Sequence, residues 1–545
     1  MVQNRQLRSN HVESHYAAAV FRYLREFSIQ FREMCTFLSL DDKHQVKVGE
    51  PGYPVAAVDR GRQVLVAKDK PFTVGDHDFT KFKVTPSVAL KVTIPETVDN
   101  TFYNGHVYVT LKNTILQPSS PMRHMAEISG IIAEQANPIL VVYTDGGGDH
   151  RVTFLSVQLG LVALFVKHKL TFVVAARCAP CQSYMDPVER VMSLLNLGLQ
   201  SVGVMRQEMP QGYEKQIHGL NTIADIRKKA LNDEELKHEL EESLTPVLDL
   251  LGCTLGRLNW KGNKLHIMEA ASDSQISSLV DILKEVDPAF EMDKTQQKHL
   301  KNYPVLQKFL DTHSYRSHYM FCLKRCTSAE CPVCSISIDT RVPSDLLEKL
   351  HYLPLPVPDE GDRIDHYKPF SELWGSTPTD KFRPSLGRHL DDDEIDKIPF
   401  TASGEKCRGF VNCEVCKKPR CFYSKKKLTG EQNEEVRKQN EDVEFTCGAQ
   451  LFYTDPRLVY MEIRITCESH VPSHYFHKRQ AYPLVCYICG DPDPLELSSE
   501  ILASHSSAHP TCEVCNQKDL NLAYEKKSVA RKAQVIKFHP VNEPQ

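Results

Sequence analysis

The stretch ILVVYTDGGGDHR, residues 139–151, decides much of the fold of this 545-residue chain. It begins with a short run of apolar and β-branched residues, which is typical of a strand buried on both faces of a sheet. The run ends on Asp145 and a glycine-rich turn, and an apolar helix is predicted next over residues 153–168. A second buried strand at residues 170–177 and a helix at residues 187–199 follow. This alternation predicts parallel strands joined by helices.

The segment upstream is richer in strands. Strand-like runs lie at residues 36–41, 62–67, 87–94 and 106–111, and a helix at residues 121–135 leads into the buried strand. Several strands followed by alternating helices and strands indicate a mixed sheet flanked by helices. The sequence therefore predicts the α/β class, with a ribonuclease H-like fold and a doubly wound fold as the two candidates.

Composition narrows the class of protein. The chain is 41% hydrophobic and 25% charged, which is ordinary for a globular protein and excludes a wholly disordered or collagen-like chain. A formal charge of −4 argues against a uniformly basic surface but permits local basic patches. We find neither an apolar leader at the N-terminus nor an apolar run long enough to span a bilayer. The sequence thus predicts a soluble intracellular protein with no membrane contact.

Cysteine usage points to zinc. Fourteen of the 18 cysteines lie between Cys322 and Cys515, mostly in CxxC pairs or short clusters. In a reducing compartment such clusters favour structural zinc over disulfides. The predicted zinc ligands form three sets: Cys322, Cys326, Cys331 and Cys334; Cys413, Cys416, Cys447 and Cys467; and Cys486, Cys489, Cys512 and Cys515. Pairing between the last two sets, as in cross-brace modules, stays open, and nearby histidines, among them His313, His318 and His470, are alternative ligands.

Acidic residues follow the predicted strands. Asp41 and Asp42 end the first strand, Asp145 ends the central one, and Glu189 lies in the first turn of a later helix. Carboxylates brought to one point would suit two Mg²⁺ (or Mn²⁺) ions, which activate a water or a 3′-hydroxyl. A solvated turn and an ordinary helix start explain the same residues without catalysis.

Four segments carry a resemblance to a known family. They read FLSLDDKHQVKVGEPGYPV, VGDHDFTKF, VYTDGGGDHRVTFLSVQLGLVALF and DPVERVMSLLNLGLQSVG. Together they resemble transposase-like proteins that are abundant in aquatic invertebrate genomes and have a DDE-type, ribonuclease H-like core. The resemblance implies that Asp41 or Asp42, Asp145 and Glu189 are the catalytic carboxylates. Because side chains alternate along a strand, only one of the two adjacent aspartates can face the site, and mariner-like relatives favour Asp41.

The resemblance also implies DNA as the partner, a nuclear location and no small-molecule cofactor, and it leaves a homo-oligomer open. The reaction would be hydrolysis of a DNA phosphodiester followed by strand transfer. Predicted DNA contacts are Lys43, His150 and Arg151 beside the carboxylates, and Lys417, Lys418, Arg420, Lys425, Lys426 and Lys427 in a basic patch with two aromatic residues between them. The alternatives are a nuclease without strand transfer and a non-catalytic, zinc-dependent scaffold that binds DNA, chromatin or protein.

The predicted organisation has six parts. They are an N-terminal helical segment (1–34), the catalytic core (35–205), a helical region (206–315), the first Cys-rich zinc motif with a linker (316–400), a zinc-ribbon or cross-brace-like region (401–525) and a basic tail (526–545).

Overall fold

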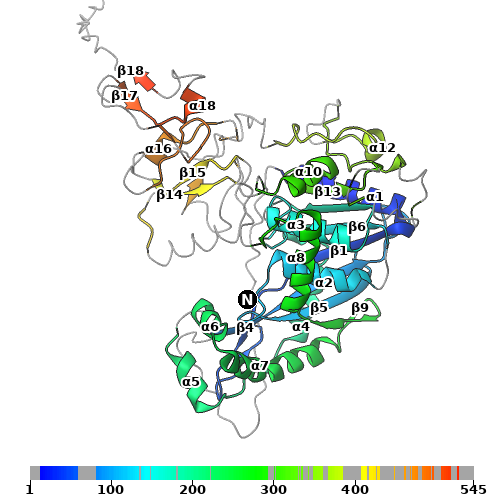
Figure 1. Ribbon diagram of the computed structural model, residues 1–545, viewed down its shortest axis with the longest axis vertical. Coiled ribbons are helices and arrows are strands. Elements are labelled where there is room, and N and C mark those ends of the chain that lie inside the picture. The colour runs from blue at the N-terminus through cyan, green and yellow to red at the C-terminus, as the bar shows by residue number, and fades with distance from the viewer. Residues whose placement is uncertain are drawn as a thin grey trace, which may run out of the picture. The chain divides into compact units, whose positions relative to one another are not determined.

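The computed structural model describes residues 13–384 except 59–80, 134–136, 148, 180–181, 221–222, 293–299, 301, 329–330, 332, 335–341, 343–347 and 360–365. Farther along it describes residues 407–413, 416–424, 426–429, 447, 459–461, 465, 467, 469–476, 482–492, 494–495, 505–516 and 524–526. The described residues form two compact units, one within Arg8–Pro384 and the other within Ser385–Gln545 (Figure 1).

A nine-stranded mixed sheet is the centre of the first unit. Its strands are β1 (Cys35–Asp42), β2 (Val46–Val48), β4 (Phe82–Val92), β5 (Gly105–Asn113), β6 (Ile139–Thr144), β7 (Phe172–Arg177), β11 (His266–Glu269), β12 (Ser314–Arg316) and β13 (Met320–Lys324). Their order is β11-β5-β4-β1-β6-β7-β13-β12, with β2 paired to β4. β1 runs antiparallel to β4 and parallel to β6, and β6 runs parallel to β7. The predicted mixed sheet flanked by helices is therefore confirmed, while the strand predicted at residues 62–67 lies outside the described residues.

Strands from later segments extend both edges of this sheet. β11 pairs parallel with β5, and β13 pairs antiparallel with β7 and carries β12 beyond it. The stretches predicted as a separate helical region and a first Cys-rich motif thus contribute to the same unit as the predicted core, up to Pro384.

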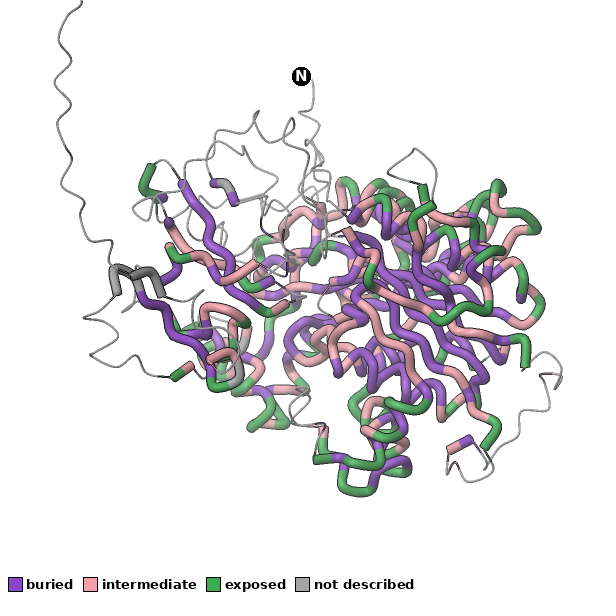
Figure 2. Tube along the Cα trace, turned by 90° about the horizontal axis from the view of Figure 1, so that it is seen from above, coloured by how far each residue is buried: buried purple, intermediate pink, exposed green. Residues whose placement is uncertain are grey.

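Side chains alternate between two apolar cores on the two faces of the sheet. Phe37, Val141 and Val174 point into one core, whereas the neighbouring Leu38 and Val142 point into the other. Helices α1 (Ser14–Gln30), α4 (Glu189–Gly198) and α7 (Glu234–Leu255) pack in the first core, and α2 (Pro121–Ala133), α3 (Leu155–Lys167), α8 (Asp273–Val286) and α10 (Pro304–His313) pack in the second. Burial on both faces explains why the central strands read as continuous apolar runs, and Figure 2 shows them buried along most of their length.

Smaller elements complete the first unit. They are α5 (Gln211–His218), α6 (Ile223–Ala230), α12 (Phe370–Leu373), the short helices η1 (Arg32–Met34) and η2 (Ser183–Met185), and the paired strands β3 (Val55–Ala56) with β8 (Gly203–Val204) and β9 (Asn259–Trp260) with β10 (Asn263–Lys264). None of the helices that the structure describes is long and apolar enough to cross a bilayer.

In the described part of the second unit there are two small sheets and two short helices. β14 (Cys407–Asn412), β15 (Pro419–Tyr423) and β16 (Tyr460–Met461) form one sheet, and β17 (His505–Ala508) and β18 (Tyr524–Lys526) form the other. The helices are α16 (Ser473–Phe476) and α18 (Glu513–Asn516).

Candidate active site and metal centres

Two of the predicted catalytic carboxylates lie side by side at the ends of neighbouring strands. In the parallel pair of β1 and β6, Leu40 is opposite Thr144, so Asp41 and Asp145 are the next residues of the two strands. Adjacent strands are about 4.8 Å apart. Leu40 points into the core lined by α2 and α3, and alternation therefore directs Asp41 to the opposite face of the sheet. The Gly147 amide donates to Asp145 Oδ1 at 2.8 Å and orients this carboxylate.

The segment that opens α4 brings two further carboxylates to the same face. Glu189 is the first residue of α4, and Asp186 lies just before it. Asp186 is fully buried, and its Oδ1 accepts hydrogen bonds from the Ser39 hydroxyl on β1 and from the Val188 amide. Its Oδ2 is buried with no hydrogen-bond partner in the part of the chain that the structure describes. Asp186 was not predicted, although an aspartate before a proline at a helix start could have suggested it.

The electrostatics of Asp41 show that these carboxylates interact. Burial raises the pKa of Asp41 well above its usual value, and the negative charges of Asp145, Asp186 and Glu189 raise it further. Burial likewise raises the pKa of Asp186. The four side chains do not form a group whose ligand atoms all lie within 4.8 Å of one another among the described residues. Ligands of a two-metal site are spread around two ions about 3.5–4 Å apart, so a wider spacing is expected there.

Asp42 belongs to a different cluster, on the other face of the sheet. Its ligand oxygen and the ring nitrogens of His124 and His150 lie within 4.8 Å of one another. His124 Nε2 lies 3.5 Å from Asp42 Oδ2, and the two imidazole rings are 4.1 Å apart. Burial, followed by the neighbouring His124, lowers the pKa of His150 to about 4. The structure therefore separates the adjacent aspartates that the sequence left as alternatives.

The residues predicted to contact DNA near the carboxylates are largely buried. His150 is 5% exposed and Arg151 9%, and the Arg151 guanidinium lies 4.4 Å from the centre of the Phe154 ring. Lys43 lines a cavity of about 410 Å³ together with Asp42 and Asp149. His150 and Arg151 are thus placed inside the fold rather than on a surface that a duplex could reach.

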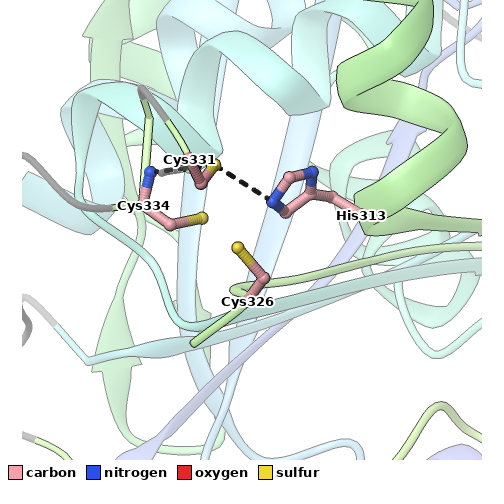
Figure 3. A group of neighbouring side chains, drawn as sticks. All are labelled: His313, Cys326, Cys331 and Cys334. Carbon is pink, nitrogen blue, oxygen red and sulfur yellow. Dashed lines mark hydrogen bonds between the residues drawn. The ribbon is translucent and has the colours of Figure 1, made fainter. Parts of the chain in front are cut away.

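The first Cys-rich motif forms a group that could hold a zinc ion. His313, at the end of α10, lies with Cys326, Cys331 and Cys334 (Figure 3), and we call these four residues the His313 group. The Cys331 sulfur is 3.4 Å from His313 Nε2. Three thiolates and one imidazole are a common ligand set for structural zinc.

Cys322 was predicted as a ligand of this set, but the structure places it elsewhere. It lies in the middle of β13, fully buried in the core that contains Phe37, while its neighbours Phe321 and Leu323 point into the core that contains Phe309 of α10. Strand alternation thus turns the Cys322 side chain away from the His313 group. His313, which the sequence analysis gave as an alternative ligand, is the fourth member of the group instead of Cys322.

The second unit contains two groups of four cysteines. Cys413, Cys416, Cys447 and Cys467 form the Cys413 group, and Cys486, Cys489, Cys512 and Cys515 form the Cys486 group. Each could hold a zinc ion, and each contains only cysteines of its own predicted set, with no crossed pairing. Burial acts to raise the pKa of Cys486, but backbone amides of Cys489 and Cys512 donate to its sulfur and the pKa falls to about 7. Cys407 and Cys421, which belong to none of the three predicted sets, pack in a small apolar core with Tyr423 and Tyr475.

The basic residues of the predicted patch differ in their exposure to solvent. Lys417, Lys426 and Lys427 are exposed, whereas Lys418 is 8% and Arg420 1% exposed. Arg420 donates to the Cys447 sulfur at 3.2 Å and to the Ser469 carbonyl at 3.0 Å. Lys425 lies outside the described residues. Arg420 is therefore engaged with the Cys413 group rather than presented to a phosphate.

We expect Arg420→Gln to weaken zinc binding by the Cys413 group about 10–100-fold, the usual effect of removing a group that hydrogen-bonds to a metal ligand. The loss follows because the guanidinium donates to the Cys447 sulfur and balances thiolate charge. Zinc release from the full chain by a competing chelator measures it, with exposed Lys417→Gln as the matched control. Unchanged zinc release combined with weaker DNA binding would instead assign Arg420 to the nucleic-acid surface.

Comparison of the chain with family models, with curated proteins and with solved structures finds no match.

Proposed function

We propose that this protein is a metal-dependent polynucleotidyl transferase of the DDE type, a DNA transposase or a protein derived from one. The observation that carries the proposal is the meeting of Asp41 and Asp145 at adjacent strand ends, on the face where Asp186 and Glu189 project from the start of α4. Their mutual repulsion in a partly buried position is a strain that divalent cations relieve.

The order of the strands supports a ribonuclease H-like core. β1, β4 and β5 are successive antiparallel neighbours, and on the other side of β1 the strands β6 and β7 continue the sheet in parallel. A doubly wound fold would be parallel in most of these positions. The resemblance to DDE-type transposase-like proteins is consistent with this order and with the four carboxylates.

The donor set fits hard divalent cations. All four side chains offer oxygen, the ligand type that Mg²⁺ and Mn²⁺ prefer, and Asp186 Oδ2 is a buried acceptor without a partner among the described residues. When bound, such ions activate a water or a 3′-hydroxyl and stabilise the leaving oxygen. Asp41, Asp145 and Glu189 would hold the ions, and the hydrogen bond from Ser39 would keep Asp186 oriented. The residues thereby contribute geometry and negative charge rather than a covalent nucleophile.

DNA binding and a nuclear location are parts of the same proposal. The exposed lysines Lys417, Lys426 and Lys427 beside the Cys413 group supply charge for phosphate contact. The zinc groups would be structural, since each has four protein ligands and no open position.

The test is a DNA cleavage and strand-transfer assay with the purified full chain. With Mg²⁺ or Mn²⁺ present, we expect nicking of supercoiled plasmid and joining of a 3′-hydroxyl oligonucleotide to it. Nicking without joining would favour a plain nuclease. Salt-sensitive DNA binding with no cleavage in either metal would overturn the catalytic proposal in favour of a zinc-dependent DNA-binding scaffold.

A further inference from the structure

A buried histidine without hydrogen-bond partners stands out on the face of the sheet opposite the proposed active site. His150 is 5% exposed, and neither ring nitrogen has a hydrogen-bond partner within the described part of the chain. A buried polar group normally has such a partner, because an unpaired one loses its hydrogen bonds to water without replacement. An unpaired imidazole therefore points to a missing ligand.

Two further metal-ligating side chains face this ring. His124 comes from α2 and Asp42 from the end of β1, and their ligand atoms lie within 4.8 Å of those of His150. The 3.5 Å between His124 Nε2 and Asp42 Oδ2 is close to the separation of about 3.4 Å that two ligands have around a tetrahedral zinc ion with bonds of about 2.1 Å. We propose that Asp42, His124 and His150 bind a divalent transition-metal ion.

The surrounding hydrogen bonds orient these ligands. The hydroxyls of Ser87 and Ser119 both donate to Asp42, the second at 2.7 Å to Oδ2. Such outer partners fix the orientation of a ligating carboxylate.

A buried lysine close to His124 opposes the binding of a cation here. Lys112 Nζ lies 3.2 Å from His124 Nδ1, 3.4 Å from His124 Nε2 and 3.0 Å from Glu127 Oε2. The second oxygen of Glu127 has no hydrogen-bond partner among the described residues, so the ammonium has an acceptor to move toward. Two carboxylates, Asp42 and Glu127, thus lie beside the one ammonium of Lys112 and the His124 ring.

A cavity adjoins one of the three ligands, Asp42. It measures about 410 Å³, and Asp42 and Asp149 lie in its wall with the cationic Lys43 and Arg227. Three protein ligands leave coordination positions for water or an anionic oxygen, and the cavity supplies room for one beside Asp42. Two imidazoles and one carboxylate suit Zn²⁺ or Fe²⁺ better than Mg²⁺, which prefers oxygen alone. This site is distinct in both place and chemistry from the proposed active site.

Zinc content of the full chain tests the inference. After equilibration with Zn²⁺ and excess Mg²⁺, wild type should retain one zinc in each of the four groups, four per chain. His150→Phe should retain three, because it removes one ligand and no hydrogen bond, and it should fold as wild type does. The matched control is His266→Phe, an exposed ring stacked on Tyr108, which should retain four. Asp41→Asn should also retain four, so failure of the proposed catalysis would leave this result unaffected.

A second measurement needs no substitution. In ¹¹³Cd-loaded wild type, cadmium bound by nitrogen and oxygen resonates far upfield of cadmium bound by thiolates. With excess Mg²⁺ present to occupy the oxygen-only carboxylate site, we expect one upfield resonance that Mg²⁺ does not displace, in addition to those of the Cys-containing groups. Equal zinc content in wild type and His150→Phe, or only thiolate-type cadmium resonances, would overturn the proposed site.

Discussion

The Asp41→Asn protein is expected to lose metal-dependent DNA cleavage by more than about 100-fold, a larger effect than removal of an outer partner of a metal ligand. The carboxamide has the same shape as the carboxylate but no charge to hold a divalent cation beside Asp145 and Glu189. A plasmid-nicking time course in Mg²⁺ and in Mn²⁺ measures the loss.

Although Asp41→Asn should abolish cleavage, it should not lower the stability of the metal-free protein. Because burial and neighbouring carboxylates raise the pKa of Asp41 in the folded state, its contribution to stability is present at low pH and is lost as pH rises through that pKa. At pH 7, without divalent metal, this raised pKa makes Asp41 destabilising relative to an uncharged side chain, and Asn removes that cost. We expect the metal-free variant to melt at or above the temperature of wild type, and Mg²⁺ to raise the melting temperature of wild type only.

An exposed aspartate on α7 provides the matched control. Asp249→Asn removes the same charge far along the chain from the carboxylates and should cleave and melt like wild type. Asp41→Asn protein that cleaves DNA at the rate of wild type would show that these carboxylates do not hold the catalytic metal. A lower melting temperature without metal would show that Asp41 is not repelled by its neighbours.

Local patterns predicted the central elements well because burial dictates them. The run at residues 139–143 is apolar throughout because β6 is covered on both faces, and the helix predicted at residues 153–168 is observed as α3. The position of Asp145 beside Asp41 also followed, because parallel strands end at the same edge of a sheet. The pairing of strands that lie far apart in the chain could not be predicted. β13 pairs with β7 across more than a hundred residues, and no local feature of its sequence, MFCLK, indicates which strand is its partner.

The positions of individual ligands also depend on contacts between segments that lie far apart in the chain, and this explains the errors about them. Spacing alone grouped Cys322 with Cys326, but the strand that contains Cys322 turns its side chain into the opposite core. For Asp41 and Asp42, by contrast, strand alternation already required different neighbours, and the favoured Asp41 is the one that lies beside Asp145. His124 escaped notice because its relation to Asp42 arises only when α2 packs on the sheet.

Removing zinc is expected to unfold the second unit while leaving the nine-stranded sheet of the first intact. Among the described residues, the apolar core around the Cys413 group contains eight buried residues, and three of them are the ligands Cys413, Cys447 and Cys467. Without metal these thiols hold no ion, and the five other residues of this core bury little apolar surface compared with structural zinc, which contributes about 10–16 kcal/mol in small zinc domains. The first unit instead has two large cores on either side of its sheet.

Hydrogen exchange on the full chain, with and without a zinc chelator, distinguishes the two units. Protection should vanish across β14 and β15 and persist in β1 and β6, whose amides pair within the large sheet. Cys413→Ser should reproduce the chelator's effect in the second unit, because it removes one of four ligands, whereas Cys253→Ser, at an exposed thiol on α7, should change nothing. Protection of β14 and β15 that survives complete zinc removal would mean that side-chain packing alone folds this unit, and the cysteine groups would then need a role other than structural support.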